Sequence, residues 1–394
     1  MSDGGFSLFS AQFVRQGAEW LRGQGADADV VISSRIRLAR NLKGFPFVKR
    51  SPRAIRERVL QLCRERLTSP DFASGAGKAG DSRILWVDVH ACTPLDRTLL
   101  VERHLISKEH ARQGVPTKPG DEASATPPNA PGAGEPRGVA ISLPDERLSI
   151  MVNEEDHLRI QVIRSGLDLA GEGGAFDQIN AVDDRLEGLP GAGGLEYAFS
   201  PRFGYLTACP TNVGTGIRVS VMLHLPGLKL TGEMEKVKRA TRDLSLAVRG
   251  YYGEGSEAVG DFYQISNQTT LGKPERIILH QFEREIIPQV IEYERAARRL
   301  LLEKRRRFLE DQVMRALGTL RYARLLTPEE SLTLLSQVRL GIVTGLITDI
   351  PESTVNQLIL LTQPAHLQRV VGRDMDQNQR REARADLVRQ QLSI

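Results

Sequence analysis

The chain has 394 residues, of which 40% are hydrophobic and 26% charged, so it can bury a sizeable core and wholesale disorder is excluded. Its 53 basic and 49 acidic residues leave a net charge of +4, too small to indicate a nucleic-acid-binding protein. No apolar run is long enough to span a membrane, the N-terminus lacks a signal-peptide pattern, and three scattered cysteines cannot form a disulfide scaffold, so we expect a cytoplasmic protein.

The first part of the sequence mixes helical and strand-like segments. Residues 52–67 and 94–106 carry apolar groups at helical spacing, and 83–92 form a short apolar run typical of a buried strand. Residues 113–137 are rich in Pro, Gly and Ala, and predict a flexible insertion because they cannot bury enough apolar surface. Three strand-like runs within 138–165 then predict an antiparallel meander.

The pattern continues with further short elements. A helix is predicted around 174–187, two strands within 203–225, a helix at 231–243 and a strand at 245–249. Residues 251–267 read as a glycine-bearing loop that runs into another strand.

Beyond residue 273 the sequence shows only helical periodicity. Residues 275–312 predict one long amphipathic helix, and 327–347 open with a capping-box pattern. We therefore predict an α+β fold, with an antiparallel-sheet domain over residues 1–300 and an all-helical domain over 301–394.

Common nucleotide and metal signatures are missing from the sequence. GAGKAG (75–80) lacks the spacing of a P-loop, and no HRD, DFG, HExxH or paired cysteine motif occurs, so no metal site built from protein ligands is predicted.

Two segments bring charged residues together instead. Arg35 and Arg37 are two residues apart, so on a strand both guanidinium groups face the same side, which suits an anion; the alternative is a solvated edge strand. The acids Glu154–Asp156 and the nearby Arg159 can orient a cation or a guanidinium, although acidic turns are also common.

Two further segments are weaker signals by themselves. Cys209 precedes a proline-containing turn that leads to Arg218, and a cysteine beside charged groups can have a shifted pKa, although buried cysteines are usually inert. Glycines within 250–255 permit a loop that folds over a ligand, with Glu254 and Glu257 near its tip.

In combination and in this order, SSRIR, NEEDHLR, CPTNVGT and GEGSE resemble the ATP:guanidino phosphotransferases, the phosphagen kinase family. The likeness spans about residues 30–270. GFPF (44–47), HLIS (104–107), FYQISNQTTLG (262–272) and the helical tail resemble the bacterial protein-arginine kinases, the McsB family. The resemblance implies ATP as the phosphoryl donor, with Mg²⁺ bridging its phosphates.

The resemblance also implies roles for particular residues. Glu155 and Glu257 match the carboxylates that hold the substrate guanidinium, and Cys209 matches the reactive cysteine beside it. The implied ATP site comprises Ser33, Ser34, Arg35, Ile36, Arg37, His104, Arg159, Arg218, Val219, Ser220, Val221, Met222, Tyr252, Gly253, Glu254, Gly255 and Ser256.

The sequence departs from the family pattern in three places. Tyr252 stands where phosphagen kinases usually have an arginine, and Arg249 is a candidate to replace it. Only 32 residues precede Ser33, where kinases for small substrates have a helical domain, so we expect an open site that admits an arginine on a protein surface. The phosphoarginine-binding motif RDxxRA is matched with Arg in place of Asp, by Arg380, Arg381, Arg384 and Ala385.

The favoured function is a protein-arginine kinase. The family likeness implies that phosphoarginine marks proteins, including a stress-gene repressor, for a Clp unfoldase–protease, that an activator protein participates, and that the helical domain forms a homodimer. Alternatives are a kinase for free arginine or another small guanidino compound, and an inactive phosphoarginine-binding adaptor or arginine-rich nucleic-acid binder. The intact set of acids and arginines disfavours inactivity, and the aromatic share of 5% disfavours nucleic-acid binding.

Overall fold

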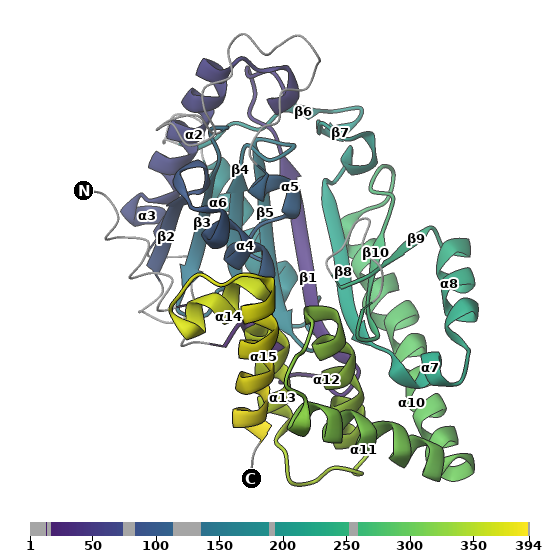
Figure 1. Cartoon of the computed structure of the whole chain (residues 1–394). Coiled ribbons are helices and arrows are strands. Elements are labelled where there is room, and N and C mark those ends of the chain that lie inside the picture. The colour runs from purple at the N-terminus through teal and green to yellow at the C-terminus, as the bar shows by residue number, and fades with distance from the viewer. Residues whose placement is uncertain are drawn as a thin grey trace, which may run out of the picture.

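The computed structural model describes residues 13, 17–73, 83–112, 135–188, 194–251 and 259–392. Within them, eight strands form one antiparallel sheet in the order β2-β3-β4-β5-β1-β8-β10-β9, with helices packed around it (Figure 1). The strands are β1 (Val31–Arg40), β2 (Arg83–Asp88), β3 (Gly138–Leu143), β4 (Leu148–Val152), β5 (Leu158–Ser165), β8 (Ile217–His224), β9 (Leu246–Arg249) and β10 (Phe262–Asn267). The expected α+β fold is confirmed.

One face of the sheet is covered by helices and forms the main core. Along β1, Ile36 and Leu38 are fully buried on this face and alternate with Arg35 and Arg37, because successive side chains of a strand point to opposite sides. The covering helices are α2 (Arg53–Leu67), α6 (Ala175–Glu187), α9 (Glu275–His280) and α10 (Ile287–Lys304).

The opposite face is covered only in part. Helix α4 (Pro94–Glu102) buries Leu99 and Leu100 against β3 and β4 at one side. At the lower end in Figure 1, side chains such as Met222 and Phe262 pack against the C-terminal helices. The polar side chains of β1, β5 and β8 lie between these two covers. The candidate site described below is built from these polar side chains.

The C-terminal helices form a region that shares a core with the sheet. They are α11 (Arg306–Tyr322), α12 (Pro328–Val343), α13 (Glu352–Leu361), α14 (Pro364–Val371) and α15 (Gln377–Leu392). The predicted capping box is confirmed: the Thr327 side chain accepts from the backbone N–H of Glu330, and the Glu330 carboxylate accepts from the backbone N–H of Thr327. No helix within the described ranges is both long and apolar enough to cross a membrane.

The prediction of one helix over 275–312 was wrong. Helix α9 gives way to a π-helical turn at Gln281–Ile286, and α10 starts directly before Pro288, whose missing N–H cannot continue a regular ladder. At Arg305 the backbone leaves the helical region (φ −137°), so α10 and α11 are separate helices.

Other predicted boundaries also shifted. The strand in 83–92 ends at Asp88, and the helix in 94–106 ends at Glu102, because His104 adopts a left-handed conformation (φ +59°) that interrupts a helix. Of the run 203–208, only Gly204–Tyr205 (β7) is a strand, paired with Phe199–Ser200 (β6). Most of the expected insertion, residues 113–134, lies outside the described residues.

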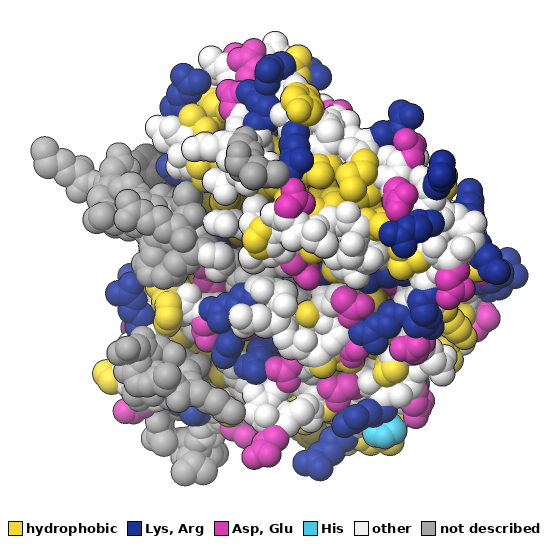
Figure 2. All heavy atoms as spheres, turned by 90° about the horizontal axis from the view of Figure 1, so that it is seen from below, with side chains coloured by type: hydrophobic (Ala, Val, Ile, Leu, Met, Phe, Trp, Pro, Cys, Tyr) yellow, Lys and Arg dark blue, Asp and Glu magenta, His cyan; other side chains and the backbone are white. Residues whose placement is uncertain are grey.

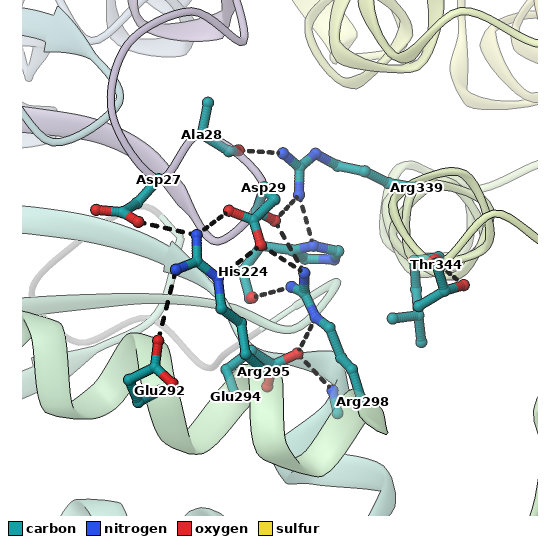
Figure 3. Close-up of polar contacts among 12 residues, drawn as sticks. Asp27, Ala28, Asp29, His224, Glu292, Glu294, Arg295, Arg298, Arg339 and Thr344 are labelled. Atoms are coloured by element: carbon teal, nitrogen blue, oxygen red, sulfur yellow. Dashed lines mark hydrogen bonds and ion pairs between the residues drawn. The ribbon is translucent and has the colours of Figure 1, made fainter. Parts of the chain in front are cut away.

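Arg339 joins the helical region to the sheet (Figure 3). It is fully buried on α12 and donates to the backbone carbonyls of Ala28 (2.7 Å) and Asp29 (3.0 Å) and to His224 Nδ1 (2.9 Å). It also forms an ion pair with Glu352 at 2.6 Å. A single guanidinium therefore ties together the segment before β1, the end of β8 and helices α12 and α13.

Candidate active site

Arginines from neighbouring strands share the partly covered face of the sheet, and this region is called the arginine face below. In the antiparallel register, Arg37 on β1 lies directly opposite Arg218 on β8, and Arg35 lies opposite Ser220. Arg35 Nε donates a hydrogen bond to Ser220 Oγ at 3.2 Å. Strand β5 pairs with the other edge of β1, and its Arg159 lies opposite Ala39. The pairing of Arg35 and Arg37 on one face, predicted from their spacing, is thus seen in the structure.

This arginine face is electrostatically strained. Burial and the positive charges of Arg218 and Arg249 lower the pKa of Arg35 to about 10. The pKa of Arg37 lies well below its usual value because of burial first, and then because Arg159 and Arg218 are close. Neither Arg35 nor Arg37 forms an ion pair within the described part of the chain. Such a cluster of cations favours the binding of a multiply charged anion.

Arg159 differs from its neighbours because carboxylates already surround it. Its guanidinium lies 2.5 Å from Glu154, 2.5 Å from Glu155 and 3.4 Å from Asp156. Burial alone would lower the pKa of Arg159, but the three carboxylates raise it above its usual value. Glu155 is the most exposed of the three acids and also lies 3.4 Å from Lys49. The acidic turn therefore presents one accessible carboxylate beside the arginine face.

Asp156 connects the acidic turn to the segment around Cys209. It is fully buried, and its Oδ1 accepts from Asn41 Nδ2 (2.8 Å) and from the backbone N–H of Ala208 (2.7 Å). Cys209 Sγ lies 3.0 Å from Thr211 Oγ1. Its position among three consecutive acids is the only signal in the sequence that points to Asp156.

His104 lies at the edge of the same face. Its ring packs edge-on against Trp20 and Tyr251, with centroid distances of 4.6 and 5.7 Å, and its carbonyl accepts from Gln161 Nε2 at 2.7 Å. Burial and the nearby charge of Arg35 lower the pKa of His104 to about 3, so its imidazole is neutral.

Comparison with known proteins identifies the family. Residues 73–297 match the model of the ATP:guanido phosphotransferase C-terminal catalytic domain, and residues 306–394 match the protein-arginine kinase McsB C-terminal domain. The protein-arginine kinase of Symbiobacterium thermophilum is 43% identical over 379 residues, which cover 96% of this chain and 98% of that protein. The protein-arginine kinase of Halothermothrix orenii is 40% identical over 377 residues, covering 96% and 97%. This chain belongs to the protein-arginine kinase family.

The expected family relationship is thereby confirmed, and the chain is an ATP-dependent phosphotransferase of the ATP:guanido type. Among solved structures, a lombricine kinase matches with a TM-score of 0.51 and 24% identity, covering 74% of this chain and 76% of that chain. At this identity the likeness supports the fold alone.

The other strand residues of the implied ATP site are distributed over both faces of the sheet. All of these are buried: Ser33, Ser34, Ile36, Val219, Val221 and Met222. Ile36, Val219 and Val221 point into the main core on the other side of the sheet. The Ser34 hydroxyl donates to a backbone carbonyl at 2.6 Å, and Met222 packs into the core shared with the helical region. Alternate residues of a strand face opposite sides, so Ser33 and Met222 share the face of Arg35, and an ATP-binding role for these six residues stays a prediction.

The glycine-rich loop cannot be placed. Its residues Tyr252, Gly253, Glu254, Gly255, Ser256 and Glu257 lie outside the described residues. Arg249, the candidate substitute for the arginine missing at Tyr252, ends β9 and is close enough to Arg35 to lower its pKa.

The residues matched to the phosphoarginine motif lie on α15, and they are Arg380, Arg381, Arg384 and Ala385. Arg384 is buried and donates to the backbone carbonyls of Thr362 (2.7 Å) and Leu326 (2.9 Å). Ala385 is fully buried in the core. In this structure Arg384 and Ala385 hold helices of the region together, and a phosphoarginine-binding role stays a prediction.

Proposed function

We propose that this chain transfers the γ-phosphoryl group of ATP to arginine side chains of other proteins. The observation that carries the proposal is the arginine face, where Arg35 and Arg37 lie beside Arg218 with lowered pKa values and neither forms an ion pair with any described residue. Phosphoryl transfer depends on positioning and charge stabilisation, which fixed guanidinium groups supply. The relatives named protein-arginine kinase support a protein as the acceptor.

The proposed chemistry uses the acidic turn. A substrate guanidinium is protonated at neutral pH and is a poor nucleophile. Glu155, together with Glu257, would hold it in line with the γ-phosphorus, and Cys209 would lie beside it. As the new N–P bond forms and the O–P bond to ADP breaks, one carboxylate accepts the departing proton. The 2.5 Å contact between Glu155 and Arg159 is a guanidinium–carboxylate pair of the kind proposed for the substrate.

We propose that Mg²⁺ arrives with the nucleotide. Within the described ranges, no group of three or more His, Cys, Asp and Glu side chains could hold a metal ion. The acids nearest the arginine face, Glu154–Asp156, are engaged by Arg159. When bound to the phosphates, Mg²⁺ would neutralise part of their charge.

Residues 301–394 are proposed to form a helical dimerisation domain, in addition to the catalytic domain over residues 1–300. The apolar residues Leu335, Val338 and Ile359 do not supply a dimer face, because they are fully buried within the chain. Figure 2 shows charged side chains of both signs over the lower face, with a hydrophobic patch among them. Exposed large hydrophobic residues of the described helical region are Phe308, Met314, Tyr322, Leu325 and Val371. A dimer face is proposed to use this second set.

Family likeness alone supports the remaining parts of the proposal. These are a cytoplasmic setting, an activator protein, a stress-gene repressor among the clients, and delivery of marked proteins to a Clp unfoldase–protease.

The deciding experiment is mass spectrometry of a model protein incubated with ATP and the enzyme, under conditions that preserve the acid-labile P–N bond. We expect phosphoarginine on the model protein, and little product with Arg35→Ala. A parallel reaction with free arginine tests the alternative substrate. Phosphorylation of free arginine without phosphorylation of the protein would replace the proposal by that alternative.

A further inference from the structure

Helix α14 of the helical region docks onto α4 through a buried carboxylate. Glu102, the last residue of α4, accepts from the backbone N–H groups of Ala365 (2.8 Å) and His366 (3.0 Å), and from His366 Nδ1 (2.7 Å). Both Glu102 and His366 are buried. Figure 1 shows α14 lying against the α4 side of the molecule. One carboxylate of the catalytic part thus caps the first turn of a helix from the other end of the chain.

The same histidine also contacts the next residue of the catalytic part. Arg103 donates from Nη1 to His366 Nε2 at 3.2 Å, so this nitrogen carries the lone pair and Nδ1 carries the proton donated to Glu102. Burial lowers the pKa of His366, in agreement with a neutral ring. Arg103 is held further by two contacts with Glu146, at 2.8 and 2.7 Å. His366 therefore bridges two consecutive residues at the end of α4.

The turn that follows these two residues lies on the arginine face. His104 has a positive φ, and its carbonyl accepts from Gln161, which is opposite Arg37 in the sheet register. Three residues later, the Ser107 hydroxyl donates to Glu154 at 2.6 Å. The turn is thus held at its start by α14, and further along by Gln161 and Glu154 beside the arginine face.

We propose that Glu102 and His366 are positioning residues for nucleotide binding. Glu102 anchors His366, and His366 holds Arg103, so the pair fixes the backbone from which His104 and Ser107 contact the arginine face. The docking of α14 therefore sets the affinity of the face for ATP, although no atom of α14 belongs to the proposed ATP site. This inference rests on the proposed function, in which that face binds the ATP phosphates.

The test compares two contacts between the same pair of helices. His366→Leu removes both side-chain hydrogen bonds of the bridge. Arg369→Met removes the ion pair between Arg369 and Asp96, which also joins α14 to α4 but does not touch the turn. Both variants should lower the melting temperature. Only His366→Leu should also weaken ATP binding measured by calorimetry, by about tenfold, because displacement of binding groups by about 1 Å is enough for such an effect.

A double-mutant cycle connects the effect to the turn. If α14 acts through His104, the double variant His104→Ala/His366→Leu should raise the Kd for ATP by less than the product of the two single-variant fold increases. Glu102→Gln and His366→Gln keep only part of the hydrogen bonding at these positions, and should bind ATP more tightly than His366→Leu but less tightly than the wild type.

Equal ATP affinities of His366→Leu and Arg369→Met, or fully multiplicative effects with His104→Ala, would overturn the inference. Should His366→Leu fail to fold, the two Gln variants carry the same comparison, and unchanged ATP affinity in both would overturn it. Arg35→Ala separates this result from the proposed function. If that variant also binds ATP normally, the assignment of the face itself is wrong.

Discussion

Replacing Arg35 by Met should stabilise the protein without ATP and weaken its binding of ATP. The pKa of Arg35 falls from 12.5 to about 10, through burial and then repulsion by Arg218 and Arg249. At about 1.4 kcal/mol per pKa unit, retaining the charge costs about 3 kcal/mol. Partial exposure reduces this figure through solvent screening, and loss of the hydrogen bond to Ser220 removes about 1 kcal/mol more. A gain in unfolding free energy of about 1 kcal/mol should remain.

Urea unfolding with and without ATP measures both effects. ATP at a hundred times its Kd should stabilise the wild type by about 2.7 kcal/mol, so the order of stability of wild type and Arg35→Met reverses when ATP is added. The control is Arg164→Met, because Arg164 forms an ion pair with Asp168 at 2.7 Å. The Arg164→Met variant should have a lower unfolding free energy than the wild type and should gain as much unfolding free energy from ATP as the wild type does. The reasoning is refuted if Arg35→Met is less stable than wild type without ATP, or if ATP stabilises both equally.

Three other substitutions probe separate features. Arg339→Met should lower the unfolding free energy by about 3–5 kcal/mol in urea titrations, because Glu352 loses its buried partner. Glu155→Gln should reduce kcat by about 10²–10⁴-fold in a phosphotransfer assay while calorimetry finds nearly unchanged ATP affinity. His110→Gln should resist acid: burial lowers the pKa of His110 from 6.5 to about 4, so the unfolded state binds more protons between these values. Stability is complete above pH 6.5 and falls below it, so at pH 5 the variant should retain about 2 kcal/mol that the wild type loses.

Each of these three has a clear contradicting outcome. An unchanged urea midpoint for Arg339→Met would show that its contacts contribute nothing net. Near wild-type turnover of Glu155→Gln would remove this residue from the chemistry. For His110→Gln, the measurement is repeated at pH 7.5, where the advantage should vanish, and parallel loss of stability down to pH 5 would contradict the assignment.

The parts of the molecule that follow from local pattern could be predicted. Alternation along β1 placed Arg35 and Arg37 on one face, and the Thr327 capping pattern marked the start of α12. The family likeness could be recognised because its motifs are short runs of consecutive residues, and the comparisons confirmed it. Local pattern failed where the backbone changed conformation although the helical spacing of apolar residues continued, as at the π-helical turn Gln281–Ile286 and at Arg305.

Contacts between distant segments could not be predicted from one sequence. The bond between His366 and Glu102 joins residues 264 positions apart, and nothing in the local sequence of either indicates the other. The same limit applies to the apolar residues of the helical region. The sequence does not show what buries Leu335 and Ile359, which lie in the core shared with the sheet. Chain topology, rather than residue type, decides such pairings.

The core shared by the sheet and the helical region has a consequence for how the protein unfolds. Trp20, Ile32 and Phe262 lie in one continuous cluster with Leu335 and other residues of the C-terminal helices. Neither part can open without exposing apolar surface of the other, so calorimetry should record a single cooperative transition. A protease cut between α10 and α11 should therefore leave two fragments that stay associated. Evolution could exchange the helical region only together with the strand ends against which it packs.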